Sequence, residues 1–237
     1  MNKQSNTYTI IYTCVLVVVM GTALAFTAMS LKGKQQENID ADKMRQILAS
    51  VHITASDDNV KSTFDKYIVK QFEINTTGEI IGNDAFSIDV AKESKEKDYT
   101  KRRLPIYMCN LSKNETKYIL PVYGAGLWGP IWGYVSINSD GSTIYGAYFA
   151  HQGETPGLGA EIEKPDFQNQ FIDKSVFNGD EFKSVAVVKV GQEPTDREYV
   201  HGISGGTITS QGVSEMLENS LAPYENYLKN LQTSEKQ

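Results

Sequence analysis

YILPVYGAGLWGPIWGYVSINSDGSTIYGAYF, residues Tyr118–Phe149, contains three apolar and aromatic runs that are separated by turn-forming residues. The runs are Tyr118–Tyr123, Ile131–Ile137 and Thr143–Phe149. Short runs of aromatic and β-branched residues are typical of strands, so each run is predicted to form one. Asn138–Gly141 has the composition of a tight turn between the second and the third. The centre of the chain is therefore predicted to be a mixed or antiparallel sheet.

Helical patterns lie on both sides of this β-rich centre. Apolar residues recur at helical spacing in Ile39–Val51 and in Val213–Leu221, and a last helix is predicted from Pro223. Strands in the middle of a chain with helices at both ends favour an α+β fold over regular βαβ alternation. The remaining predicted elements are a helix over Asp57–Lys70, a hairpin over Ile68–Ile81 that turns at Thr77-Gly78, and a strand over Phe182–Val190.

The N-terminal region is apolar over the length of a membrane. No charged residue occurs from Gln4 to Leu31, and the 22 residues of Ile10–Leu31 rise about 33 Å as a helix, enough to cross a hydrocarbon core of about 30 Å. A cleavable signal peptide with a site at Ala23-Leu24-Ala25 is the alternative, but the apolar stretch is longer than such segments usually are. The sequence is divided into a tail at 1–7, one transmembrane anchor at 8–31, a helical linker at 32–60 and a soluble domain at 61–237.

Charge and cysteine content exclude several classes of protein. The formal net charge of −6 and the lack of a basic patch argue against nucleic-acid binding. Cys14 lies in the apolar stretch and Cys109 in the soluble part, so they form neither a disulfide framework nor a metal-ligand set. No nucleophile–histidine–acid pattern is recognisable, so no catalytic residue and no metal ligand is assigned. A redox role would require an organic cofactor.

Gly124–Gly129 matches G-x-G-x-x-G after a predicted strand, but it does not predict a dinucleotide site. Pro130 follows the last glycine, and the next residues alternate as a strand does instead of opening a helix. The pattern has its dinucleotide meaning only where the glycines lead into a helix N-terminus. We expect a glycine-bent hairpin.

Ser204–Ser210 places the hydroxyl of Thr207 on a glycine-paved loop before a helix that is expected to begin near Gln211. Two adjacent glycines allow a close approach of backbone to ligand, and a helix N-terminus favours a negative charge. A phosphate on Thr207 would be stabilised there. A helix N-cap rich in serine and threonine is the alternative, and the spacing alone does not decide between them.

His151–Gly159 contains a second turn, at Pro156-Gly157. Such a turn can lay backbone amides and one apolar side chain against a planar ring system, as a flavin would require. An ordinary connection between elements remains the alternative.

Three stretches together resemble one protein family: Pro121–Trp128, Gly153–Gly159 and Ser204–Ser210. The chain resembles the NqrC family, the C subunits of the sodium-translocating NADH:quinone reductase, and more distantly the G subunit of the Rnf electron-transfer complex. The resemblance covers nearly the whole chain. It implies that the soluble domain binds FMN, with the flavin site within residues 120–222.

The resemblance also implies particular site residues. Thr207 matches the threonine that carries FMN through a phosphoester, and the second wall of the flavin cleft matches the turn at Glu154–Gly159. Two positions of the attachment motif depart from the family, since His201 stands where an aspartate is usual and Gly206 replaces an alanine. The full set of expected cofactor-binding residues is Thr207, Ser204, Gly205, Gly206, Thr209, Glu154, Thr155, Gly157 and Leu158.

By the same resemblance, the chain is expected to relay electrons inside a complex that couples NADH oxidation and quinone reduction to sodium export. Its expected partners are the other subunits, membrane lipid and a flavin transferase that attaches the FMN. The expected location is a bacterial inner membrane, with one span and the soluble domain on the periplasmic side. An Rnf-type subunit and an anchored structural module without flavin are the alternatives.

Overall fold

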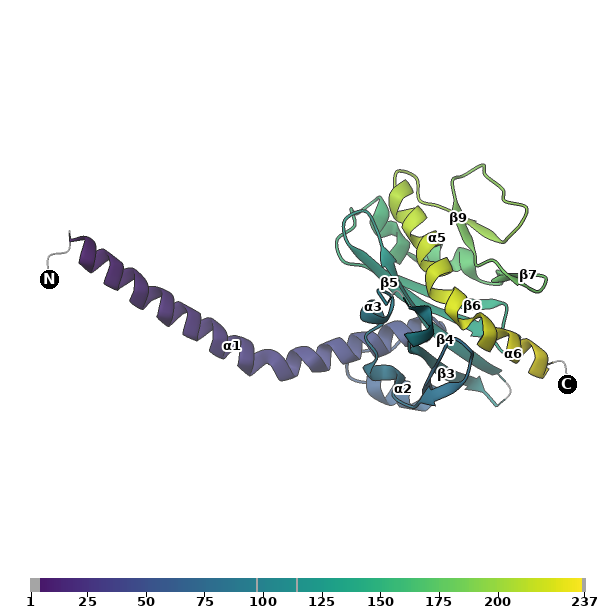
Figure 1. Cartoon of the computed structure of the whole chain (residues 1–237), viewed down its shortest axis with the longest axis horizontal. Coiled ribbons are helices and arrows are strands. Elements are labelled where there is room, and N and C mark those ends of the chain that lie inside the picture. The colour runs from purple at the N-terminus through teal and green to yellow at the C-terminus, as the bar shows by residue number, and fades with distance from the viewer. Residues whose placement is uncertain (1–4, 97, 114, 236–237) are drawn as a thin grey trace. The chain divides into compact units, whose positions relative to one another are not determined.

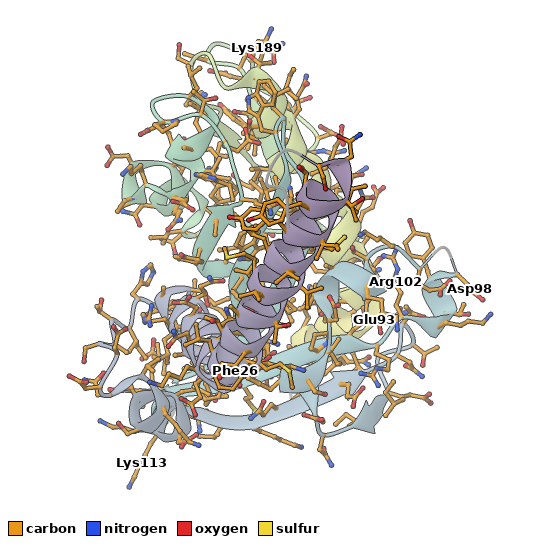
Figure 2. The ribbon with its side chains drawn as sticks, turned by 90° about the vertical axis from the view of Figure 1, so that its left-hand side faces the viewer. Phe26, Glu93, Asp98, Arg102, Lys113 and Lys189 are labelled. Carbon is orange, nitrogen blue, oxygen red and sulfur yellow. The ribbon has the colours of Figure 1, made fainter. Side chains whose placement is uncertain are left out.

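The computed structural model describes residues 5–96, 98–113 and 115–235 and divides into two compact units, Met1–Lys43 and Met44–Gln237. The first helix, α1 (Asn6–Ala49), contains the whole apolar stretch. Its side chains there are exposed, as Phe26 is in Figure 2. Within the described residues, α1 is the one helix long and apolar enough to cross a membrane. The N-terminal region thus fits a single-pass membrane anchor.

The second unit is built on a six-stranded sheet in which every neighbouring pair of strands is antiparallel, in the order β2-β1-β3-β4-β5-β6. The three strands expected in Tyr118–Phe149 are β4, β5 and β6, and the hairpin expected over Ile68–Ile81 is β1 with β2. The α+β prediction is confirmed. The strands are β1 (Ile68–Ile74), β2 (Ile80–Gly82), β3 (Leu104–Ser112), β4 (Glu115–Ala125), β5 (Pro130–Asn138) and β6 (Ile144–His151).

Helices and short strands complete the unit. Figure 1 shows α5 and α6 lying across the large sheet. The helices are α2 (Val60–Tyr67), α3 (Val90–Glu93), α4 (Pro165–Gln168), α5 (Thr207–Leu221) and α6 (Glu225–Glu235), with 3₁₀ turns at Ala85–Ser87, Tyr99–Lys101, Gly159–Glu163, Asn169–Phe171 and Ala222–Tyr224. The short strands are β7 (Phe177–Asn178), β8 (Glu181–Phe182), β9 (Ala186–Val188) and β10 (Tyr199–His201), paired as β7 with β8 and β9 with β10.

Both faces of the large sheet are buried, and successive side chains along a strand alternate between them. On one face, Leu120 belongs to the main apolar core together with Leu217 of α5. On the other face, Tyr107 packs edge-on against the rings of Phe64 and Tyr134. The last residues of α1 belong to this second face.

Two hydrogen bonds fix the end of α1 to the sheet. The Ser136 hydroxyl donates to the Ser50 carbonyl at 2.6 Å, and the Trp132 indole N–H donates to Gln46 Oε1 at 3.1 Å. Ile47 and Leu48 are fully buried beside them. The helix is therefore part of the packed domain from Met44 onward.

Three predicted boundaries were wrong. The helix expected from about Gln211 begins at Thr207, because Gly206 already serves as its N-cap. The strand expected over Phe182–Val190 is interrupted at Ser184, whose φ is 56°. The N–H groups of Lys183 and Ser184 both donate to the carbonyl of Val176, which leaves only β9 to pair with β10. The helix expected over Asp57–Lys70 ends at Tyr67, and β1 begins at the next residue, Ile68.

Candidate functional site

The Ser204–Ser210 loop delivers Thr207 to the first position of α5. Gly205 has a φ of 75°, which favours glycine, and Gly206 is the N-cap without a side chain to cap the helix. The first N–H groups of a helix have no partner within it, so the N–H groups of Thr207 and the next residues point outward from the N-terminus of α5. The loop is anchored from behind, since the Ile203 N–H donates to Ser210 Oγ at 2.9 Å. Thr207 is half-buried at a helix terminus that favours an anion.

A cleft of about 440 Å³ opens beside Thr207. Its lining comes from β9, the turn that follows β9, the Gly202–Gly205 loop and the first turn of α5. This volume lies within the range of about 300–1,000 Å³ that is usual for small-molecule sites. Lys189 is the one charged residue among those that line it, and the described part of the chain forms no ion pair with its ammonium group.

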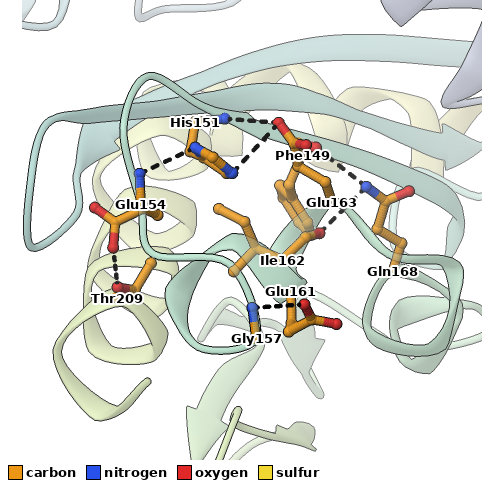
Figure 3. A network of polar contacts seen from close by, with 9 residues as sticks. All are labelled: Phe149, His151, Glu154, Gly157, Glu161, Ile162, Glu163, Gln168 and Thr209. Carbon is orange, nitrogen blue, oxygen red and sulfur yellow. Dashed lines mark hydrogen bonds and ion pairs between the residues drawn. The ribbon is translucent and has the colours of Figure 1, made fainter. Parts of the chain in front are cut away.

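The carboxylate of Glu154 joins all three motifs that carry the family resemblance. Its Oε2 accepts a hydrogen bond of 2.5 Å from the hydroxyl of Thr209, in the first turn of α5. Its Oε1 accepts one of 2.8 Å from the backbone N–H of Trp128, in the turn between β4 and β5. Glu154 is only 4 % exposed. Figure 3 shows its side chain directed at Thr209 from the turn that contains Gly157.

Glycines bring the three segments together at closer range than other residues would allow. A Cβ placed on Gly126 or on Gly159 would collide with the carboxylate oxygens of Glu154. A Cβ on Gly205 would lie 2.6 Å from Cδ2 of Leu158, and one on Gly206 would lie 3.3 Å from the N of Gly159. The Ser204–Ser210 loop and the turn at Glu154–Gly159 are therefore in direct contact.

The turn that carries Glu154 is itself held by hydrogen bonds, which Figure 3 draws. Nδ1 of His151 accepts from the Glu154 N–H at 3.1 Å, and the Gly157 N–H donates to Glu161 Oε1 at 3.1 Å. His151 N–H donates to Glu163 Oε1 at 3.3 Å. His151 thus has a structural role in this turn.

The predicted site residues lie in one region of the structure, but some line the cleft, some are exposed beside it and some are buried. Ser204, Gly205 and Thr207 line the cleft, and Gly206 caps the helix behind them. Thr155, Gly157 and Leu158 are exposed on the neighbouring turn. Glu154 and Thr209 instead face inward and bind each other, and Thr209 is 1 % exposed.

Sequence reasoning missed Lys189. Lys189 directly follows the short strand β9, which ends at Val188, in a stretch that was predicted to be one continuous strand. The sequence therefore gave no signal that Lys189 lines a cleft. Trp128 is 69 % exposed in the turn between β4 and β5, Ile208 is 55 % exposed on α5, and Leu158 is 40 % exposed on the turn at Glu154–Gly159. Large apolar side chains thus border the Thr207 loop in water-exposed positions.

His201, which stands at an unusual position of the family motif, lies outside the cleft. His201 lies at the end of β10, where its backbone N–H donates to Gln170 Oε1 at 3.0 Å and its ring packs edge-on against Tyr199. It is not among the residues that line the cleft beside Thr207. In the ranges 5–96, 98–113 and 115–235, no group of three or more His, Cys, Asp or Glu side chains is placed to hold a metal ion.

Comparison with known proteins gives consistent matches. A family model described as an FMN-binding domain matches residues 126–222. The Na(+)-translocating NADH-quinone reductase C subunit of Vibrio anguillarum is 32 % identical over 232 residues, which cover 92 % of this chain and 91 % of that protein.

Two solved structures are similar to the chain. The crystal structure of the Na(+)-translocating NADH-quinone reductase C subunit from Parabacteroides distasonis has 49 % identity and a TM-score of 0.79, and the match covers 84 % of this chain and 96 % of that one. NqrC of Shewanella oneidensis shares the fold with a TM-score of 0.69 at 22 % identity, over 83 % of this chain and 99 % of that one.

Proposed function

Because this chain belongs to the family of Na(+)-translocating NADH-quinone reductase C subunits, we propose that it is an electron-carrying subunit of such a complex, with FMN esterified to Thr207. The chain contains an FMN-binding domain at residues 126–222. The observation that carries the proposal is the position of Thr207, at the first residue of α5 and beside a cleft. Bound there, FMN supplies the electron transfer.

The N-terminus of α5 is a favourable place for a phosphodiester. An ester between Thr207 Oγ and the FMN phosphate adds one FMN to the chain and releases one water, and it leaves one negative charge on the phosphate. The free N–H groups of the first turn and the helix dipole stabilise that charge. Gly205 adds one more backbone N–H group, and neither it nor Gly206, whose N–H donates to the Ile203 carbonyl, has a side chain that would obstruct the phosphate.

Lys189 adds a positive charge to the lining of the cleft. Because its ammonium group has no carboxylate partner in the described residues, it is available to an anion in the cleft. Its charge complements the phosphodiester. It also opposes the cost of adding negative charge to the cofactor during reduction.

The exposed apolar side chains near the loop suit the flat ring of the flavin. Leu158 already touches the attachment loop at Gly205, and Thr155 lies on the same turn. We expect Leu158 and Thr155 to contact the isoalloxazine ring, with Trp128 at its border. A ring held by an ester bond does not need a deep pocket to stay bound, so it can remain exposed to the partners with which it exchanges electrons.

The proposed partners follow from membership of the complex. The other subunits would supply and accept the electrons, and a flavin transferase would form the ester bond. The apolar part of α1 would hold the chain in a bacterial inner membrane, with the soluble domain on the periplasmic side. In that complex, NADH oxidation and quinone reduction would be coupled to sodium export.

Attachment is tested by expressing the full chain with a flavin transferase. We expect a band that fluoresces on a denaturing gel under ultraviolet light and a mass increase of one FMN less one water. Thr207→Ala should abolish both, because no oxygen is left to form the ester. Ser204→Ala and Thr209→Val, which remove the neighbouring hydroxyl groups, should keep both signals. Wild-type protein without fluorescence and without the mass increase would sink the electron-carrier proposal.

A further inference from the structure

A buried carboxylate is unusual unless its oxygens are bound, and in Glu154 both are. The Thr209 hydroxyl donates to Oε2 at 2.5 Å and the Trp128 N–H donates to Oε1 at 2.8 Å. We propose that Glu154 is the positioning residue of the flavin site: it fixes the first turn of α5, and with it Thr207, against the other two segments of the site. The inference rests on the proposed function, because it assigns a role within the same FMN site.

Burial distinguishes this role from direct contact with the cofactor. Glu154 is 4 % exposed and Thr209 is 1 % exposed, whereas Thr207 is half-buried and Leu158 is exposed. The carboxylate lies beneath the surface of the site. Glu154 therefore acts through Thr209 and Trp128, each of which belongs to a segment that borders the site.

The surrounding backbone is built to admit this one side chain. Gly126 and Gly159 lie so close to the carboxylate that a Cβ on either would collide with its oxygens. The hydrogen bond from Glu154 N–H to His151 Nδ1 fixes the backbone from which the side chain projects. A shorter Asp would not reach both donors from that backbone, and Gln is the variant that keeps the shape.

The negative charge of Glu154 should also affect the reduction potential of the FMN. A negative charge that is shielded from water acts over a longer range than an exposed one. Thr209, which binds it, lies two residues after Thr207 on the same helical turn. The carboxylate therefore disfavours the uptake of an electron by the FMN, and its removal raises the reduction potential.

The test uses the full flavinylated chain in detergent. The variants are Glu154→Gln, which removes the charge and keeps the shape, Thr209→Val, which removes the hydroxyl group, and the two combined. Three properties are measured: the reduction potential of the FMN, its circular dichroism in the visible range, and the midpoint of thermal unfolding. Glu161→Gln is the matched control, because Glu161 is a carboxylate of the same segment that accepts from the Gly157 N–H instead.

We expect Glu154→Gln to raise the reduction potential and Thr209→Val to change it less, because the charge remains. Both should alter the visible circular dichroism of the FMN, which reports how the ring is held. Both should lower the unfolding midpoint, and the double variant should lose less than the sum, because the two residues share one hydrogen bond. Glu161→Gln should alter the circular dichroism less than Glu154→Gln does, because the remaining carbonyl oxygen can still accept from the Gly157 N–H.

The inference is overturned if the double variant loses the full sum and the flavin signals of Glu154→Gln match those of Glu161→Gln. A wild-type chain without FMN would instead overturn the proposed function. In that case the unfolding midpoints of the four proteins still decide whether Glu154 and Thr209 are coupled. The two failures are therefore distinguishable.

Discussion

Lys189 is the residue whose charge should act most directly on the cofactor. Its side chain lines the cleft beside Thr207, and Figure 2 shows it far from Lys113, which projects from the connection between β3 and β4. Lys189→Gln should lower the reduction potential of the FMN, because a positive charge that stabilises the reduced form is lost. The effect should be below about 1 kcal/mol, since the side chain is exposed and solvent screens it.

The measurement is a potentiometric titration of the FMN at low and at high salt. The shift for Lys189→Gln should shrink as salt is added, because exposed charges are screened within about 10 Å at 0.1 M. Lys113→Gln makes the same change of charge at a distance and should leave the potential unchanged. Equal shifts for the two variants would show that Lys189 has no specific role.

At this scale, the sequence predicted which residues gather but not which way each one points. Thr207, Gly205 and Leu158 were expected in one site, and the structure places them together. Glu154 and Thr209 were expected at the flavin, but they bind each other in the interior. Their hydrogen bond joins residues 55 positions apart, and a pairing of this kind depends on the packed fold. The position of Lys189 on the cleft could not be predicted either, because it depends on the end of β9 at Val188.

Among the elements, α5 links the site to the core. Its first residue is Thr207, and its inner side contains Leu217, which is fully buried against the large sheet. Replacing a buried leucine by alanine usually costs about 2–5 kcal/mol through lost apolar contact and an unfilled cavity. Leu217→Ala should therefore lower the free energy of unfolding by that amount, as measured by urea denaturation.

Ile208→Ala is the control on the same helix. Ile208 is exposed, so its replacement should change the free energy of unfolding by less than about 0.5 kcal/mol. If the two variants were equally stable, α5 would not be packed against the sheet as described.

The predicted strands were confirmed where the apolar runs and the turn-forming residues between them indicated the same boundaries. β4, β5 and β6 were found where three aromatic runs alternate with glycine and asparagine turns. The strand expected over Phe182–Val190 failed because Ser184 takes a left-handed conformation that its sequence does not signal. The start of α5 was predicted four residues too late. Its N-cap, Gly206, has no capping side chain, so the sequence does not distinguish it from a loop residue.

For the whole molecule, buried acidic groups predict sensitivity to alkaline pH. Burial raises the pKa of the Cys109 thiol to about 11 and the pKa values of the Tyr107 and Tyr224 phenols well above their ordinary value. A folded-state pKa that lies above the unfolded one gives stability that is complete below the unfolded pKa. That stability is lost as the pH rises toward the folded pKa.

The free energy of unfolding should therefore be constant near neutral pH and fall above about pH 9, where thiols and phenols of the unfolded chain begin to ionise. Urea denaturation across this range measures it. Cys109→Ala should flatten the first part of the fall and leave the part due to the tyrosines. A free energy of unfolding that rises above pH 9 would contradict the assignment.

The limit of the folded domain can be tested by truncation. The compact unit begins at Met44, and the end of α1 contributes the buried Ile47 and Leu48 together with the bond from Ser136 to Ser50. A chain that begins at Met44 retains all of these and lacks the apolar part of α1. It should therefore be soluble without detergent and unfold in one cooperative transition.

A chain that begins at Val51 loses two buried aliphatic side chains, each worth about 2–5 kcal/mol, and should be much less stable in urea. Equal stability of the two chains would mean that the domain starts later, closer to the boundary at residue 61 that the sequence predicted.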